Sequence, residues 1–187
     1  VHVDIKYLPR MPDEAEHRDL LAAIDRASRW VYFEIQPDKT ARTAAGFLER
    51  LHAKAPFRIR TVLTDNGKEF TDRFCATGER EPTGQHVFDQ TCTAHGIQHR
   101  LIKPKHPQTN GMIERFNGRV AEVLKTTAFT SARHLETTLQ HYLHLYNQYV
   151  PQKNLGHVTP VAKLKEYYRT KPALFQKMPI NHTGPNS

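Results

Sequence analysis

The sequence predicts an α/β fold in which a mixed five-stranded sheet is flanked by helices. Apolar and polar residues alternate over residues 1–8, as in a strand, and two further short apolar runs follow before the first helical pattern. Beyond residue 40, segments with helical spacing alternate with short apolar runs. This order of three strands, helix, strand, helix, strand and further helices is typical of a sheet that combines antiparallel and parallel strands.

Five segments are expected to be strands. In the first, Val3 and Ile5 face one side, whereas His2 and Asp4 face the other. The first three are separated only by short polar stretches, so we expect them to form an antiparallel meander. The five expected strands are Val1–Leu8, Leu20–Ile24, Trp30–Ile35, Ile59–Leu63 and Ile97–Leu101.

Helices are expected where apolar residues recur every three or four positions and a capping residue precedes them. Asp38 or Thr40 can cap the first helix, Ser131 a later one, and Thr159 followed by Pro160 begins a short last one. Gly96 is expected to end the second helix. The expected helices run from Ala41 to Pro56, over Val87–His95, from Met112 to about Thr127, from Ser131 to Val150, and from Pro160 onward.

Composition narrows the functional classes. The net charge of +8 favours an anionic partner, most often nucleic acid. The longest apolar runs are far shorter than the ~18 residues of a membrane span, and the first residues do not resemble a signal peptide. Two cysteines cannot form a disulfide framework, which favours a reducing compartment. Because the chain starts with Val1, we expect it to be a piece of a longer or processed protein.

The chain is expected to contain one main domain. Residues 1–168 carry the patterned segments and are taken as the domain core. Residues 71–86 are polar and aperiodic, and are expected to form a surface insertion. Residues 169–187 are polar with several prolines, and are expected to form a linker or tail.

Three carboxylates stand out by their positions. Asp4 lies in the middle of a strand that is expected to be central, where a carboxylate is costly unless it is paired or binds a metal. Asp65 follows a strand end, and Glu114 lies at the start of a helix. Ordinary alternatives exist: an edge strand or salt bridge for Asp4, turn initiation for Asp65, and a helix-dipole interaction for Glu114.

Taken together, these three acids suggest one site. Hard oxygen ligands suit Mg²⁺ or Mn²⁺, and two such ions can promote cleavage of a phosphodiester. On the expected helical wheel, Glu114 shares a polar strip with Asn117, Ala121 and Lys125. A basic surface around such a site would hold a polyanion.

Two motifs resemble those of the DDE integrase and transposase superfamily. Thr64-Asp65-Asn66-Gly67-Lys68-Glu69-Phe70 is similar to the second-acid motif. The stretch from Lys103 to Gly111, followed by Glu114-Arg115-Phe116-Asn117, is similar to the third-acid motif. Asp4 in Val-His-Val-Asp-Ile matches the first acid, and residues 23–30 resemble the hairpin that follows it. The resemblance covers residues 1 to about 168 and is closest to bacterial insertion-sequence transposases.

The resemblance implies an RNase H-like fold and a polynucleotidyl transferase. Such an enzyme hydrolyses a phosphodiester at the ends of a DNA element and then joins the freed 3′-hydroxyl to target DNA. Asp4, Asp65 and Glu114 would be the catalytic residues and the ligands of Mg²⁺ or Mn²⁺, with two ions expected. The resemblance also implies DNA as partner, a homodimer or higher multimer that pairs through the helices at residues 41–54 and 131–150, and a cytoplasmic, nucleoid-associated location in a bacterium.

The sequence departs from the family in one respect. Between Asp65 and Glu114 lie 48 residues, a longer interval than in the best-known members. The additional residues fall in the polar stretch at residues 71–86, where an insertion need not change the position of either acid.

Several polar residues near the third acid are expected to contact DNA phosphates, although a solvated surface is the ordinary alternative. They are Lys103, Lys105, His106 and Gln108 before the helix, and Arg115, Asn117, Arg119 and Lys125 on it. A zinc site built from Cys75, His86, Cys92 and His95 is a weaker hypothesis, because their spacing matches no known finger pattern. Two functional alternatives stay open: a nuclease of the same fold that cuts without joining, and a catalytically silent DNA-binding module.

Overall fold

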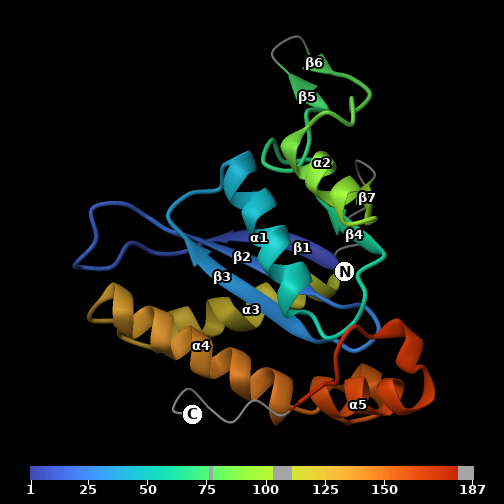
Figure 1. Ribbon diagram of the computed structural model, residues 1–187. Helices are drawn as coiled ribbons and strands as arrows, with labels where there is room; N and C mark the ends of the chain where they lie inside the picture. The colour runs from blue at the N-terminus through green and yellow to red at the C-terminus, as the bar shows by residue number, and fades with distance from the viewer. Residues whose placement is uncertain (76–77, 103–110, 181–187) are drawn as a thin grey trace.

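The computed structural model describes residues 1–75, 78–102 and 111–180. A five-stranded sheet lies at the centre, with strands in the order β3-β2-β1-β4-β7, so β1 is the middle strand (Figure 1). Its strands are β1 (His2–Tyr7), β2 (Asp19–Ile24), β3 (Val31–Gln36), β4 (Thr61–Thr64) and β7 (Gln98–Leu101). All five strands lie where the sequence predicts them, within a few residues.

The pairing of the strands confirms a mixed sheet. β1, β2 and β3 pair antiparallel along their full length, as expected of a meander. β4 pairs parallel to β1, with His2 opposite Leu63, and β7 pairs parallel to β4. This parallel half brings the carboxyl ends of β1, β4 and β7 to the same edge of the sheet, where ligand sites of open α/β sheets lie.

Five α-helices in the described residues surround the sheet, and their N-caps follow the sequence expectation. The side chains of Thr40, Ser131 and Thr159 each accept a hydrogen bond from the backbone N–H three residues on. None of the helices in these ranges has the length and apolar character that crossing a bilayer needs. The helices are α1 (Ala41–Lys54), α2 (Val87–Ala94), α3 (Gly111–Thr126), α4 (Ala132–Gln148) and α5 (Pro160–Thr170).

Two hydrophobic cores cover the two faces of the sheet. On one face, Val3 of β1 packs with α1, α2 and α5 through residues such as Phe47, Phe88 and Leu164. On the other face, β2 and β3 pack against α3 and α4, whose apolar stripes are centred on Phe116 and Leu139. The result is a three-layer α/β/α domain, the RNase H-like arrangement that the resemblance implies (Figure 1).

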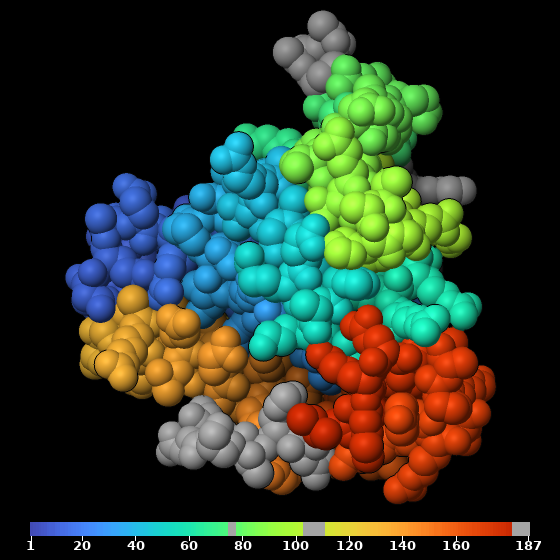
Figure 2. Space-filling model, in the orientation of Figure 1, coloured from blue at the N-terminus to red at the C-terminus, as the bar shows by residue number. Residues whose placement is uncertain are grey.

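The expected insertion at residues 71–86 contains more structure than its aperiodic sequence indicates. Two short strands, β5 (Phe74–Cys75) and β6 (Gly78–Glu79), pair antiparallel as a separate hairpin. Ion pairs from Arg73 to Glu79 and from Arg80 to Asp72 stabilise it. This part of the chain protrudes at one end of the molecule, as expected of an insertion that leaves the sheet unchanged (Figure 2).

The stretch from residue 169, expected to be a linker or tail, begins as part of the packed domain. α5 continues to Thr170, and two short 3₁₀ helices, η2 (Lys153–Leu155) and η3 (Pro172–Leu174), flank it. Phe175 is buried and forms a β-bridge with Phe57. Residues 181–187, the rest of the expected tail, lie outside the described residues.

A buried amide fastens α4 to the sheet. Asn147 accepts a hydrogen bond from the backbone N–H of Val31 at 3.0 Å and donates one to the carbonyl of the same residue at 2.8 Å. Both groups lie at the beginning of β3 and are buried. Because an unpaired buried backbone group is costly, this one side chain fixes the position of the end of α4.

The variant Asn147→Ala should lower the free energy of unfolding by about 2–4 kcal/mol, because two buried backbone groups lose their partners. The variant His141→Ala, at an exposed position of the same helix, should change it by less than about 0.5 kcal/mol. Urea denaturation followed by circular dichroism measures both values. Equal, small changes in the two variants would show that the hydrogen bonds between Asn147 and Val31 do not stabilise the fold.

Candidate active site

Asp4 occupies the middle of the central strand. Its carboxylate lies on the face that α3 covers, where Nδ2 of Asn117 donates a hydrogen bond to Oδ2 of Asp4 at 2.7 Å. Burial raises the pKa of the Asp4 carboxyl, and the negative charges of Asp65 and Glu114 raise it further. The structure therefore places the three acids within electrostatic reach of one another.

Asp65 follows the last residue of β4. The parallel pairing of His2 with Leu63 brings Asp65 level with Asp4 on the neighbouring strand. The backbone N–H of Gly67 donates to Oδ1 of Asp65 at 2.9 Å, and Nδ2 of Asn66 donates to the carbonyl of Ile102 just after β7 at 2.8 Å. These two bonds orient the turn, so that the Asp65 carboxylate lies exposed at the edge of the sheet.

The backbone at Gly67 lies close to the side chain of Glu69. A Cβ atom on Gly67 would lie 2.6 Å from Oε1 of Glu69, so a larger residue would require this buried carboxylate to move. The backbone N–H groups of Phe70 and Thr71 both bond to the Gly67 carbonyl, which closes the turn. The Asp65-Asn66-Gly67 sequence thus serves the geometry of the turn as well as the chemistry of the acid.

Glu114 lies in the first turn of α3 and is exposed, as the expected polar strip requires. Asn117, the next member of that strip, differs from expectation. It was expected to contact DNA, but it is only 9% exposed and its amide is bonded to Asp4. This bond orients the Asp4 carboxylate, and the expected contact of Asn117 with DNA stays a prediction.

The donor chemistry of these acids suits a divalent cation. Carboxylate oxygens are preferred ligands of Mg²⁺ and Mn²⁺, and the pKa of Asp4 is raised by burial first and by the charges of Asp65 and Glu114 in addition. Beside Asp4, the buried Oδ1 of Asn117 has no hydrogen-bond partner in the described part of the chain. Within that part, however, no three His, Cys, Asp or Glu side chains already form a group that could hold an ion, so the acids converge less fully than expected.

A groove with arginine walls lies toward the amino ends of β1 and β4. It encloses about 600 Å³ and reaches His2 and Leu63, which lie two residues before Asp4 and Asp65 on their strands. A second cavity of about 190 Å³ continues it along α3. The basic residues that line the two are Arg26, Arg29, Arg100, Arg115, Arg119 and Lys153. None of them forms an ion pair with a carboxylate among the described residues.

Arg29 is held in an unusual backbone conformation at the junction of these cavities. Its φ angle is +61°, in the left-handed region that non-glycine residues rarely adopt. Asp25 stabilises the turn by accepting hydrogen bonds from the backbone N–H and the hydroxyl of Ser28. Burial lowers the pKa of the Arg29 guanidinium. Strain and a desolvated charge together are typical of functional positions.

The other expected DNA contacts divide into two groups. Arg115 and Arg119 line the groove, whereas Lys125 is exposed in the last turn of α3. Lys103, Lys105, His106 and Gln108 lie outside the described residues. Sequence reasoning missed Arg26, Arg29, Arg100 and Lys153, because they come from a hairpin, a strand and a 3₁₀ helix far apart in the chain.

The zinc hypothesis has no support in the described residues. Cys92 is buried, and burial raises the pKa of its thiol to about 12. His86 caps α2, and His95 pairs with Glu49. No group of three potential ligands forms around them among the described residues.

Comparison with known proteins identifies the family. One integrase core domain family profile matches residues 1–107, and a second matches residues 95–160. The chain is 36% identical over 115 residues to an uncharacterized 39.2 kDa protein of insertion element IS476 from Xanthomonas euvesicatoria. It is 30% identical over 105 residues to the retrovirus-related Pol polyprotein from transposon TNT 1-94 of Nicotiana tabacum.

These two alignments cover 61% and 55% of this chain, but only 29% and 7% of the respective relatives. The chain thus corresponds to a limited part of each longer protein. The first family match is stronger evidence, because residues 1–107 are more than half of the 187 residues and include β1, β4 and the turn that carries Asp65. The chain therefore belongs to the integrase core domain family.

Proposed function

We propose that the chain is the catalytic core of a DDE transposase, which cuts and joins DNA strands. The observation that carries this proposal is the environment of Asp4, a carboxylate in the central strand. Asn117 donates a hydrogen bond to it, and burial and the negative charges of Asp65 and Glu114 raise its pKa. The charges of two acids from two other elements act on this carboxylate, which supports a shared site. Membership of the integrase core domain family supports the same activity.

In the proposed reaction, water attacks a phosphodiester at the end of the DNA element and frees a 3′-hydroxyl. That hydroxyl then loses its proton and attacks a phosphodiester of target DNA, whose bond to the target strand's own 3′-oxygen breaks; this oxygen leaves as a 3′-hydroxyl, and the element end is joined to the 5′ side of the target. Asp4, Asp65 and Glu114 would hold Mg²⁺ or Mn²⁺, which when bound supplies activation of the attacking oxygen and stabilisation of the leaving oxygen. Asn117 would keep the Asp4 carboxylate oriented during both steps.

The arginine groove would hold the DNA backbone beside the acids. Its cations lack ion-pair partners within the described residues, so a phosphate would not have to displace a carboxylate. Arg29 and Arg115 lie where the two cavities meet and would contact the strand nearest to the acids. Phosphate contacts do not read base sequence, so the core would bind DNA without sequence preference.

Assembly into a homodimer or higher multimer is part of the same proposal. On α4, Leu145 is exposed, and Tyr149 just beyond the helix is 65% exposed. Most apolar residues of α1 are buried in the domain's own core, so the contribution of α1 to a dimer would be small. Sedimentation at high protein concentration distinguishes the multimer from a monomer.

The variants Asp4→Asn, Asp65→Asn and Glu114→Gln should each reduce both cleavage and joining by at least about 10³-fold, because each removes a charged ligand from the site. An assay with labelled oligonucleotides and Mn²⁺ measures both products. Glu122→Gln, an exposed position on the same helix, serves as the matched control and should keep full activity. Normal activity in any of the three acid variants would remove that residue from the proposed site.

Asp4 should also make stability depend on pH. The pKa of Asp4 in the folded protein is raised above the ordinary value of 3.8. In the pH window between the ordinary pKa and the raised one, the folded state therefore binds a proton more readily than the unfolded chain. Stability therefore falls as the pH rises through this window. Without divalent ions at pH 7, Asp4→Asn should melt at a higher temperature than the unchanged protein, and the difference should shrink as the pH falls through the window.

Addition of Mg²⁺ or Mn²⁺ at pH 7 should raise the melting temperature of the unchanged protein, because the ion binds the folded state preferentially. The same addition should have a much smaller effect on Asp4→Asn. Differential scanning calorimetry measures both. An equal effect on the two proteins would place the ion elsewhere.

Arg29→Gln and Arg115→Gln should each weaken binding to every DNA sequence alike. Each should also reduce the slope of log K against log salt concentration by about one, because one phosphate contact is lost. The unchanged chain should bind in the range of about 10⁻⁴–10⁻⁶ M at physiological salt, as non-specific binding does. Arg169→Gln, an exposed position at the end of α5, is the control and should bind as the unchanged chain does. Fluorescence anisotropy with duplexes of unrelated sequence measures these affinities. Equal DNA affinities in all three variants would contradict the assignment of the groove as the DNA-binding surface.

A further inference from the structure

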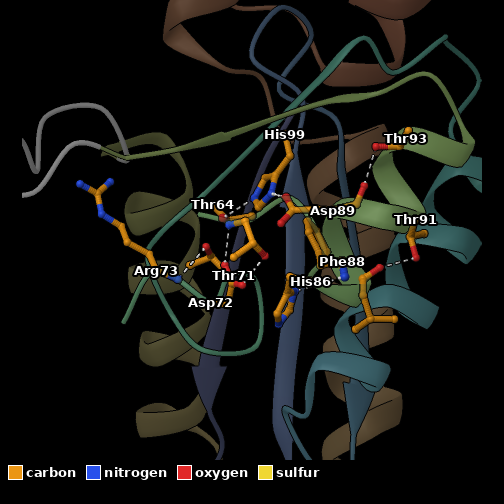
Figure 3. Close-up of polar contacts among 12 residues, drawn as sticks. Thr64, Thr71, Asp72, Arg73, His86, Phe88, Asp89, Thr91, Thr93 and His99 are labelled. Atoms are coloured by element: carbon orange, nitrogen blue, oxygen red, sulfur yellow. Dashed lines mark hydrogen bonds and ion pairs between the residues drawn. The ribbon is translucent and has the colours of Figure 1, made fainter. Parts of the chain in front are cut away.

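A chain of three polar side chains lies on the face of the sheet opposite to Asp4 and ends at Asp65. Oγ1 of Thr64, the last residue of β4, lies 2.9 Å from Nε2 of His99 on β7. Nδ1 of His99 lies 2.5 Å from Oδ1 of Asp89 on α2. Figure 3 shows the three residues in this order, with His99 between the other two.

The protons of these groups limit the direction of each bond. A carboxylate only accepts, so Nδ1 of His99 donates toward Asp89. The hydroxyl of Thr64 lies 2.9 Å from both the backbone carbonyl of Asp65 and Nε2 of His99, and the direction of its bond to His99 follows from the ring tautomer. His99 therefore links Asp89 to Thr64.

The surroundings favour this hydrogen-bonded chain. Asp89 lies in the first turn of α2, where the helix dipole stabilises a carboxylate. The rings of Phe88 and His99 pack edge to face with their centres 5.0 Å apart, which limits access of water. The side chain of His99 is 7% exposed and that of Asp89 is 16% exposed. The bond between them therefore lies in an environment that strengthens hydrogen bonds.

The chain acts on the backbone that carries the second acid. The carbonyl of Asp65 accepts from Thr64, while the N–H of Ile102 donates to the carbonyl of Thr64 at 2.9 Å. With the bond from Asn66 to Ile102, these contacts fix the strand end on both sides of Asp65. Thr64 itself is fully buried, so its hydroxyl is not available to substrate.

We propose that Thr64, His99 and Asp89 are positioning residues that hold Asp65 in place for the reaction. The proposal rests on the function proposed above for Asp65. It adds a connection from α2, through β7, to the active-site edge of β4. A fixed orientation of a catalytic carboxylate increases the reaction rate, because the reacting groups must be held in a narrow range of geometries.

The first test needs no catalytic activity. A ¹⁵N-labelled sample at pH 7 should show a ring N–H signal for Nδ1 of His99, assigned by its loss in His99→Gln. In Asp89→Asn this N–H loses its carboxylate acceptor, and its signal should shift or disappear. The absence of a ring N–H signal at Nδ1 in the unchanged protein would overturn the bond from His99 to Asp89.

The second test separates positioning from folding. Thr64→Val should reduce the rates of cleavage and joining about tenfold with unchanged DNA affinity, whereas Thr64→Ser should restore them to within about twofold. Thr93→Val, the same change at an exposed position of α2, should leave the rates unchanged. Full rates in Thr64→Val, or no rescue by Thr64→Ser, would overturn the positioning role.

The outcome for Asp65→Asn distinguishes the two proposals. An inactive Asp65→Asn together with a fully active Thr64→Val would leave the proposed function intact and remove only the positioning role. An active Asp65→Asn would remove the proposed role of Asp65 and with it any catalytic consequence of the chain. The NMR signals of His99 report on the hydrogen-bond assignment in either case.

Discussion

The carboxylate of Asp4 in the central strand is the constraint on which the rest of the site depends. A charge at this position loses much of its hydration, and the raised pKa of Asp4 records that cost. The described residues compensate for it only in part, through a backbone hydrogen bond from Ile5 and the amide of Asn117. The helix α3 must therefore lie close to β1, and it does so through Phe116 and Val120, which pack in the core on that face.

The topology of the sheet then determines what surrounds Asp4. Parallel pairing of β1 with β4 and of β4 with β7 brings Asp65 and Arg100 to the same region, although 34 residues separate them. The antiparallel meander brings the strained turn at Arg29 to the amino end of β1, because Ile24 pairs with His2. Arg29 and Arg100 therefore line the same groove, on the strands that also carry Asp4 and Asp65 or next to them.

Local patterns in the sequence predicted the elements well, because alternation, helical spacing and capping residues act over a few positions. Thr40, Ser131 and Thr159 cap their helices as expected, and Gly96 ends α2 with a positive φ. The short hairpin β5–β6 and the packing of Phe175 against the domain could not be predicted in this way. Both depend on contacts that leave no periodic pattern in the sequence.

The site was predicted less completely than the fold. Resemblance to a family supplied Asp4, Asp65 and Glu114, but the direction of the Asn117 side chain depends on how α3 packs against the sheet. The pairing of His99 with Asp89 and Thr64 likewise requires α2, β7 and β4 to be placed first. Side chains that act through contacts between elements become visible only in three dimensions.

We propose that this core joins DNA strands and does not only cut them. Product analysis tests this most directly: the protein is incubated with Mn²⁺, a labelled oligonucleotide that carries the ends of its own element, and an unlabelled target duplex. We expect labelled strands longer than the starting oligonucleotide, in which the 3′ end is joined to target DNA. Shortened strands without any joined product would contradict it and indicate a nuclease.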